Sequence, residues 1–140
     1  MIITDDERAV ADLVRSARRV AVLGIKTEAQ SGQPAFYVAE YLARAGVEVV
    51  PVPVYYPETT TILGKPVVRK VIDAGAIDLV DVFRRPKDVA GHLDDLLAAK
   101  PPAVWLQSGI RNDEVAETLA KAGIKVVQDR CLMVEHRRFA

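Results

Sequence analysis

The sequence has little of what most often reveals a protein's partners. It holds one cysteine, Cys131, so no internal disulfide can form and a reducing compartment is expected. Lys and Arg number 19, and Asp and Glu also 19, so the zero net charge predicts neither a nucleic-acid partner nor an anionic membrane. No apolar run approaches a bilayer span, and the acidic N-terminal stretch 1–10 is unlike a secretory signal. We therefore expect a soluble cytoplasmic protein.

Motifs for catalysis and metal binding are also absent. The cysteine and histidines show no metal-ligand spacing, and there is no G-x-S-x-G elbow, Walker loop or evident inward pair of carboxylates. His92 is expected on the surface of a helix and His136 in a basic tail. Cys131 fits either a small packing residue or a redox-active thiol. The sequence predicts no metal site and no catalytic residues.

Apolar runs alternate with amphipathic segments along the whole chain. Strands are expected at 19–24, 47–52, 77–83, 103–107 and 124–128. Helices are expected from a capping box at Thr4 and Glu7 to about Arg18, and at 34–46, 86–99 and 112–123, with a proline-rich loop at 51–66 and a basic tail at 135–140. Short apolar strands separated by helices predict a parallel sheet covered on both faces. We predict a single α/β domain over 1–140, a Rossmann-like, doubly wound sheet in three αβα layers.

Ligands of such sheets bind beyond the carboxyl ends of the strands, where the strand order reverses. The loop after the first strand, in VAVLGIKTEAQSGQPAFYVAEYL, lacks the G-x-G-x-x-G spacing of a dinucleotide site, because Gly24 is followed by Ile25-Lys26 and the next glycine is Gly32. Small and polar residues before a helix N-terminus, with the Lys26 charge, favour a phosphate. The alternative is an ordinary connecting loop with a solvated lysine.

The loops after the next three strands are further candidates for ligand contacts. The second strand leads into Tyr55 and Tyr56 without the acid that holds the ribose of NAD, which disfavours NAD(P). The two tyrosines could cover a ligand or pack on the protein. The adjacent arginines Arg84 and Arg85 could bind phosphate or stack on a base. Alternatively, they could form a solvated corner. The segment 107–109 lies where a ligand would reach, and could equally form a plain turn.

Together these residues resemble the small single-domain CoA-binding proteins, whose fold is shared with the CoA-binding domain of the succinyl-CoA synthetase alpha subunit. The matching segments, from about Val20 to Arg138, are VAVLGIK, EVVPV, ILGKPVV, DLVDVFRRP, AVWLQSGIRNDEVAETLAKAG and VVQDRC…EHRR. Two segments depart from the family pattern. The common Gly-Ala-Ser is Gly24-Ile25-Lys26 here, so a charge stands in place of a serine, and a Pro-Asn-Pro type strand end is Val52-Pro53-Val54.

The resemblance implies that coenzyme A or acyl-CoA lies across the carboxyl edge of the sheet. The implied contacts are Gly24, Ile25, Lys26, Thr27, Ser31, Gly32, Gln33 and Pro34 for the phosphates, Pro53, Val54, Tyr55, Tyr56, Val82, Phe83, Arg84 and Arg85 for the adenosine part, and Gln107, Ser108 and Gly109 for the pantetheine arm. It also explains the missing acid after the second strand, because the CoA ribose carries a 3′-phosphate that a carboxylate would repel.

The function implied is CoA or acyl-CoA binding without catalysis, as a carrier, sensor or regulator. Nothing in the sequence matches the second synthetase domain with its phosphorylated histidine, so ligase activity is not implied. The alternatives are a CoA-binding subunit of an acyl-CoA ligase or transferase completed by a partner chain and, less favoured, an NAD(P)-linked reductase. A mixed disulfide between Cys131 and the CoA thiol is a further hypothesis. The acyl group, the pathway and self-association into a homo-oligomer stay open.

Overall fold

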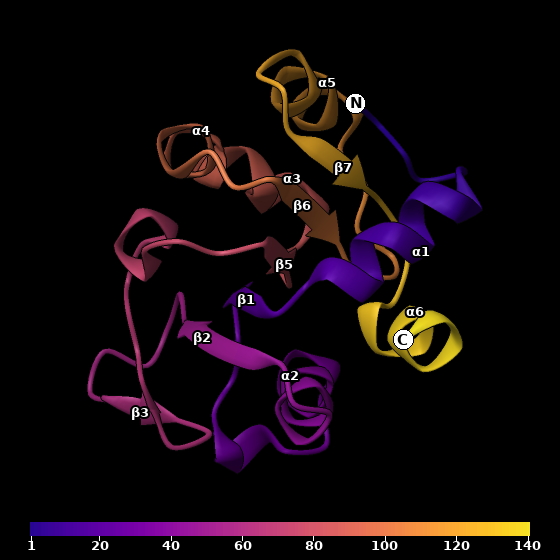
Figure 1. The fold of residues 1–140 in the computed structure, drawn as a ribbon. Coiled ribbons are helices and arrows are strands. Elements are labelled where there is room, and N and C mark those ends of the chain that lie inside the picture. Colours follow the sequence, from indigo (N-terminus) through magenta and orange to yellow (C-terminus); the bar gives the residue numbers. More distant parts are fainter.

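The computed structural model describes all of residues 1–140 and has a parallel sheet between two layers of helices (Figure 1). The strands are β1 (Arg19–Leu23), β2 (Glu48–Val52), β5 (Leu79–Val82), β6 (Ala103–Leu106) and β7 (Lys125–Val127). Their order is β2-β1-β5-β6-β7, and every neighbouring pair is parallel. The chain leaves β1 toward β2 and later returns to the other side of β1 through β5. The predicted Rossmann-like, doubly wound α/β fold is therefore confirmed, with its switch point between β1 and β5.

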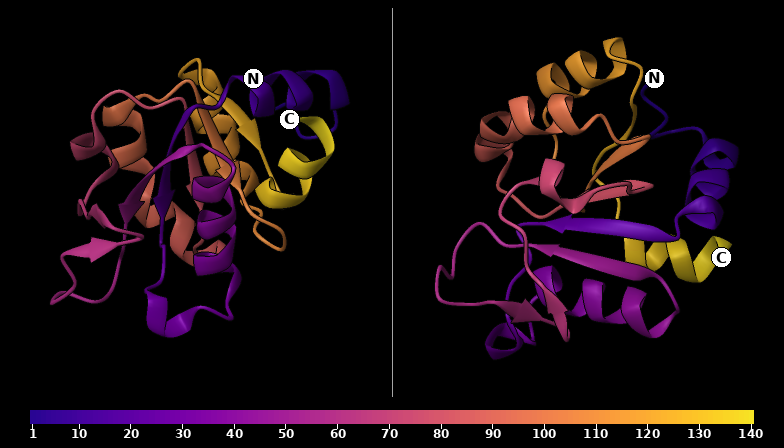
Figure 2. Two further views of the ribbon diagram at one scale, coloured as in Figure 1. Left: turned by 60° about the horizontal axis from the view of Figure 1, so that its bottom comes forward. Right: turned by 60° about the vertical axis from the view of Figure 1, so that its left-hand side comes forward.

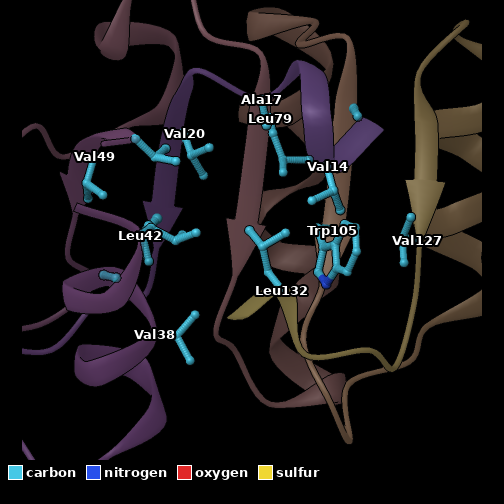
Figure 3. Close-up of a cluster of buried hydrophobic side chains, with 14 of the residues drawn as sticks. Val14, Ala17, Val20, Val38, Leu42, Val49, Leu79, Trp105, Val127 and Leu132 are labelled. Carbon is cyan, nitrogen blue, oxygen red and sulfur yellow. The ribbon is translucent and has the colours of Figure 1, made fainter. Parts of the chain in front are cut away.

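Successive side chains of each strand point to opposite faces of the sheet, so the core is divided into two apolar clusters. Val20 and Val22 of β1 face the cluster that α1 (Glu7–Ser16), α2 (Pro34–Arg44) and α6 (Leu132–Phe139) cover. Ala21 and Leu23 face the opposite cluster, under α3 (Pro86–Val89), α4 (Leu93–Ala99) and α5 (Asp113–Lys121). Figure 3 shows part of the first cluster, in which Trp105 of β6 lies between Val14 and Val127.

The predicted helix over 86–99 is broken in the structure. It consists of α3, a 3₁₀ turn η3 (Ala90–His92) and α4. The break falls at Gly91, because glycine has the weakest helix propensity after proline. No helix is both long enough and apolar enough to cross a membrane.

The two ends of the predicted pattern also differ from expectation. The first helix is capped by Asp6, whose side chain accepts from the Ala9 N–H, while the Thr4 hydroxyl accepts from the Gln128 N–H. The capping box at Thr4 and Glu7 was therefore wrong. The basic tail is the helix α6, which lies against α1 and α2 (Figure 2). The proline-rich loop holds a small antiparallel hairpin, β3 (Thr61–Ile62) with β4 (Lys65–Pro66), followed by a 3₁₀ turn, η2 (Val71–Ala74).

Candidate functional site

A cleft of about 620 Å³ opens at the carboxyl end of the sheet, beside the N-terminal ends of α2 and α6. Its lining consists of Lys26, Gln33, Pro34, Ala35, Tyr37, Phe83, Arg84, Arg85, Pro86, Gln107, Ser108, Ile110, Cys131, Met133 and Val134. A cleft of this size at a switch point is the usual place for a small-molecule ligand in this class of sheet.

The structure brings eight of the predicted contact residues together in this cleft. They are Lys26, Gln33, Pro34, Phe83, Arg84, Arg85, Gln107 and Ser108. The remaining predicted contacts, Gly24, Ile25, Thr27, Ser31, Gly32, Pro53, Val54, Tyr55, Tyr56, Val82 and Gly109, are outside the lining. Among these, Ile25 and Val82 are buried in the two apolar clusters. The contact of these residues with a ligand stays a prediction.

One end of the cleft is basic. Lys26, Arg84 and Arg85 all line it, and the lining contains no aspartate or glutamate. The Lys26 ammonium donates to the Gln33 side-chain carbonyl, and the Lys26 N–H donates to the Ala35 carbonyl at 3.0 Å. These bonds hold the lysine over the first turn of α2, where the helix dipole adds positive potential.

Arg84 is the most restrained of the three cations, with 14% of its side chain exposed. Its Nε donates to Nε2 of His92 at 3.1 Å, and its Nη1 donates to the Tyr55 hydroxyl at 3.2 Å. The guanidinium also lies 5.4 Å from the centroid of the Tyr55 ring. Burial, and after it the Arg84 charge, lowers the pKa of His92 below its ordinary value, so the ring is neutral and Nε2 can accept. The hydrogen bond from Arg84 lowers the pKa of Tyr55.

His92 and Tyr55 therefore act on the cleft by positioning Arg84. The sequence placed His92 at the surface, but it is half-buried, because the helix breaks at η3 and turns the ring toward Arg84. Arg85 is more exposed and donates through Nε to Asp88 at 2.8 Å.

Gly24 shapes the basic end through its backbone. Its φ is +85°, and a Cβ at this position would lie 2.1 Å from the Phe83 carbonyl oxygen and 3.2 Å from Cδ of Arg84. Only glycine allows the turn after β1 to cross so close to the end of β5. The contact of Gly24 with phosphate that the resemblance implies stays a prediction, and the structure adds that Gly24 lies against the backbone that carries Arg84.

The opposite end of the cleft is apolar and was missed by the sequence analysis. Met133, Val134 and Cys131 come from α6 and its N-cap, and Ile110 comes from the loop after β6. Tyr37 of α2 lies between the basic and the apolar parts of the lining, one helical turn after Gln33. The signal was present as three consecutive apolar residues at 132–134, but this segment lies between the predicted strand at 124–128 and the predicted basic tail at 135–140 and was assigned to no element.

Buried hydrogen bonds fix α6 in place beside the cleft. Gln107 is buried, and its side-chain carbonyl accepts from the Leu132 N–H at 2.9 Å. Arg130 donates to the Thr4 carbonyl at 2.7 Å and to Glu135 at 2.8 Å, and its own carbonyl accepts from Trp105 Nε1 at 2.7 Å. The predicted pantetheine contact Gln107 is thus also a structural anchor of the apolar wall.

Beneath the cleft lies a buried carboxyl group without a partner. Asp81 of β5 is paired in register with Val22 and Trp105, two residues before the cleft residue Phe83. It is fully buried, and neither of its carboxyl oxygens has a hydrogen-bond partner. Burial raises the pKa of Asp81 well above its ordinary value. A carboxyl group in such a position is held as the neutral acid.

Comparison with known proteins identifies the class and then the family. The fold and cleft define a Rossmann-like α/β domain with a ligand-sized site at its switch point. The chain belongs to the CoA binding domain family, whose sequence pattern matches residues 18–137. It is 31% identical to protein YneT of Bacillus subtilis over 129 residues, covering 91% of both chains.

Solved structures show the same architecture. The Thermus thermophilus protein ID.343 is 39% identical with a TM-score of 0.86, covering 96% of this chain and 99% of that chain. A hypothetical protein from Pyrococcus horikoshii OT3 is 25% identical with a TM-score of 0.83, covering 95% of this chain and 91% of that chain. An acetyl-coenzyme A synthetase from Ca. Korarchaeum cryptofilum shares the fold at 20% identity and a TM-score of 0.66, over 83% of this chain and 27% of that chain.

Proposed function

We propose that residues 1–140 form one domain that binds coenzyme A or acyl-CoA in the cleft, in the cytoplasm, as a carrier, sensor or regulator. The observation that carries the proposal is the charge of the lining. Three cations and no carboxylate line the cleft, although the whole chain has no net charge. Asp88, just outside the lining, pairs with Arg85 and Arg84 and offsets only part of this positive charge. Such a concentration of positive charge at a switch point fits the phosphates of a nucleotide cofactor.

The geometry suggests how the cofactor would lie. Lys26 and the first turn of α2 would hold the diphosphate, and Arg84 with Arg85 would hold the adenosine 3′-phosphate. Tyr55, which already contacts Arg84, would border the adenine. The pantetheine arm would then pass Ser108 toward α6.

One observation favours the second candidate, a CoA-binding subunit of a larger ligase or transferase. A domain of this fold makes up about a quarter of the acetyl-coenzyme A synthetase chain that it resembles, with 27% of that chain covered. Capture of a nucleotide-grasp partner chain from native lysate would support this candidate, and finding self-association alone would contradict it.

Binding of CoA is expected to raise the melting temperature, and dephospho-CoA to raise it less. Ligand at a hundredfold excess over Kd stabilises the folded state by about 2.7 kcal/mol, which is roughly 10 °C in Tm for a domain of this size. Differential scanning fluorimetry with CoA, dephospho-CoA and NAD(P) tests the proposal. It fails if NAD(P) shifts the melting temperature while both forms of CoA leave it unchanged.

The Arg84→Gln variant sharpens this test. Loss of a charge-assisted contact to phosphate is expected to weaken CoA binding by about 10- to 100-fold in calorimetry. Dephospho-CoA should be affected much less, since it lacks the 3′-phosphate assigned to Arg84. Arg111→Gln is the matched control, because Arg111 is exposed, pairs with Asp113 and lies outside the cleft. Equal losses for both ligands would contradict the assignment of Arg84 to the 3′-phosphate.

A further inference from the structure

The cleft changes character along the edge of the sheet. In the order β2-β1-β5-β6-β7, the cations follow β1 and β5, as Lys26 and Arg84 with Arg85. The lining residues that follow β6 and β7 are apolar apart from Gln107 and Ser108. A ligand that lies across the edge therefore meets phosphate-binding groups first and an apolar wall at its far end.

The apolar end is left uncovered by the protein itself. Val134 is 49% exposed and Tyr37 is 37% exposed, and both line the same cleft. Few large apolar side chains of the chain are this exposed, and the others are Met1, Ile2, Tyr55 and Ile72. Exposed apolar surface gathered in a concave site is typical of a surface that a ligand covers.

The cations of α6 and its N-terminal loop are all engaged elsewhere. Arg130 and Arg138 pair with Glu7 and Glu135, and the Arg137 guanidinium lies over the ring of Tyr41. None of the three lines the cleft. The far end therefore offers no positive charge to a second carboxylate, such as the one at the end of a dicarboxylic acyl group.

We propose that the wall formed by Ile110, Met133 and Val134, with Tyr37 beside it, receives an uncharged aliphatic acyl chain. The preferred ligand is then an aliphatic acyl-CoA thioester, ahead of free CoA and of succinyl-CoA. This inference rests on the proposed function, because it takes the basic end of the cleft as the seat of the CoA phosphates. It adds the chemical class of the acyl group.

Isothermal titration calorimetry with CoA, succinyl-CoA, butyryl-CoA and octanoyl-CoA tests the inference. Each methylene group that leaves water strengthens binding by about fourfold. Because the wall is open on one side, partial burial of the octanoyl chain is expected to give about tenfold tighter binding than free CoA. Succinyl-CoA is expected to bind no more tightly than CoA. Equal affinities for CoA and octanoyl-CoA would overturn the inference.

Substitution of the wall identifies where the chain lies. Val134→Ser should lower the ratio of the octanoyl-CoA affinity to the CoA affinity severalfold, since the serine removes apolar surface that the acyl chain would cover. Ile72→Ser is the matched control, because Ile72 is similarly exposed at 48% but lies outside the cleft. If Val134→Ser weakens CoA and octanoyl-CoA equally, the wall contacts the pantetheine arm and the acyl assignment is wrong.

The two levels of the proposal fail in different ways. Binding of CoA without any acyl preference overturns this inference and leaves the proposed function in place. Absence of binding by CoA and by all three thioesters overturns the proposed function itself, and the inference with it.

Discussion

Asp81→Asn is expected to raise the free energy of unfolding, by an amount that grows with pH. In the folded protein burial raises the pKa of Asp81, whereas in the unfolded chain the carboxyl has its ordinary pKa near 3.9. Between these two values the folded state binds the extra proton, so the stability of the wild type falls as pH rises. Asparagine has a similar shape and cannot ionise, so this loss is absent from the variant.

The gain should grow by about 1.4 kcal/mol for each pH unit above pH 5, until the pH reaches the folded-state pKa of Asp81. Urea denaturation of both proteins between about pH 5 and pH 8 measures it. Burial also lowers the pKa values of His92 and His136, but their contributions cancel in the difference between the two proteins. A difference that stays constant over this range would show that Asp81 is ionised in the folded state.

Asp78→Asn is the matched control for this substitution. Asp78 lies just before the same strand, and its carboxylate accepts from the Arg18 and Arg19 N–H groups, both at 2.9 Å. Its charge is therefore used in the folded state, and its loss should lower the free energy of unfolding by about 1 kcal/mol. The two aspartates should thus respond with opposite signs.

Gly24→Ala is expected to lower the free energy of unfolding by about 2–5 kcal/mol. An L-residue at this positive φ costs about 1–2 kcal/mol, and relief of the contact with the Phe83 carbonyl requires a backbone shift that costs about 1–3 kcal/mol more. Because the end of β5 must move, Arg84 should move with it and CoA binding should weaken. Urea denaturation measures the stability, and calorimetry with CoA measures the second effect.

Gly32→Ala separates the role of Gly24 from a general need for glycine in this loop. A Cβ on Gly32 meets nothing within 4 Å, and its backbone is outside the left-handed region. The change is expected to be neutral or to stabilise by up to about 1 kcal/mol, since alanine restricts the unfolded chain. A loss at Gly32 as large as that at Gly24 would contradict the close-approach explanation.

Local pattern was enough to predict the sheet. The strands were found within one or two residues at their amino ends because each is a short apolar run, buried on both faces, between helical segments. The topology expected for such a sheet then predicts that Lys26 and Arg84 lie at the same edge. Both residues do line the cleft there.

Contacts between distant parts of the chain could not be predicted in the same way. Glu135 and Arg138 were assigned to a basic tail, but both belong to the helix α6. In the structure Glu135 pairs with Arg130, and Arg138 pairs with Glu7. Glu7 is more than 120 residues in sequence from Arg130 and Arg138, the two arginines with which it pairs. The bond from Arg84 to His92 spans only eight residues, but it could not be predicted either, because it depends on the break at η3.

The two ends of the cleft come from different elements of the fold, so their residues can change independently among homologues. The cations come from the turns after β1 and β5, whereas the apolar wall comes mainly from the first turn of α6 (Figure 1). Gln107 and Arg130 hold α6 through groups other than the wall side chains. Val134 is therefore free to vary without disturbing either the anchor of the helix or the basic end, whereas Met133 also packs against the first apolar cluster. Homologues could therefore differ in the group that they select at the apolar end and still share the cofactor-binding residues at the basic end.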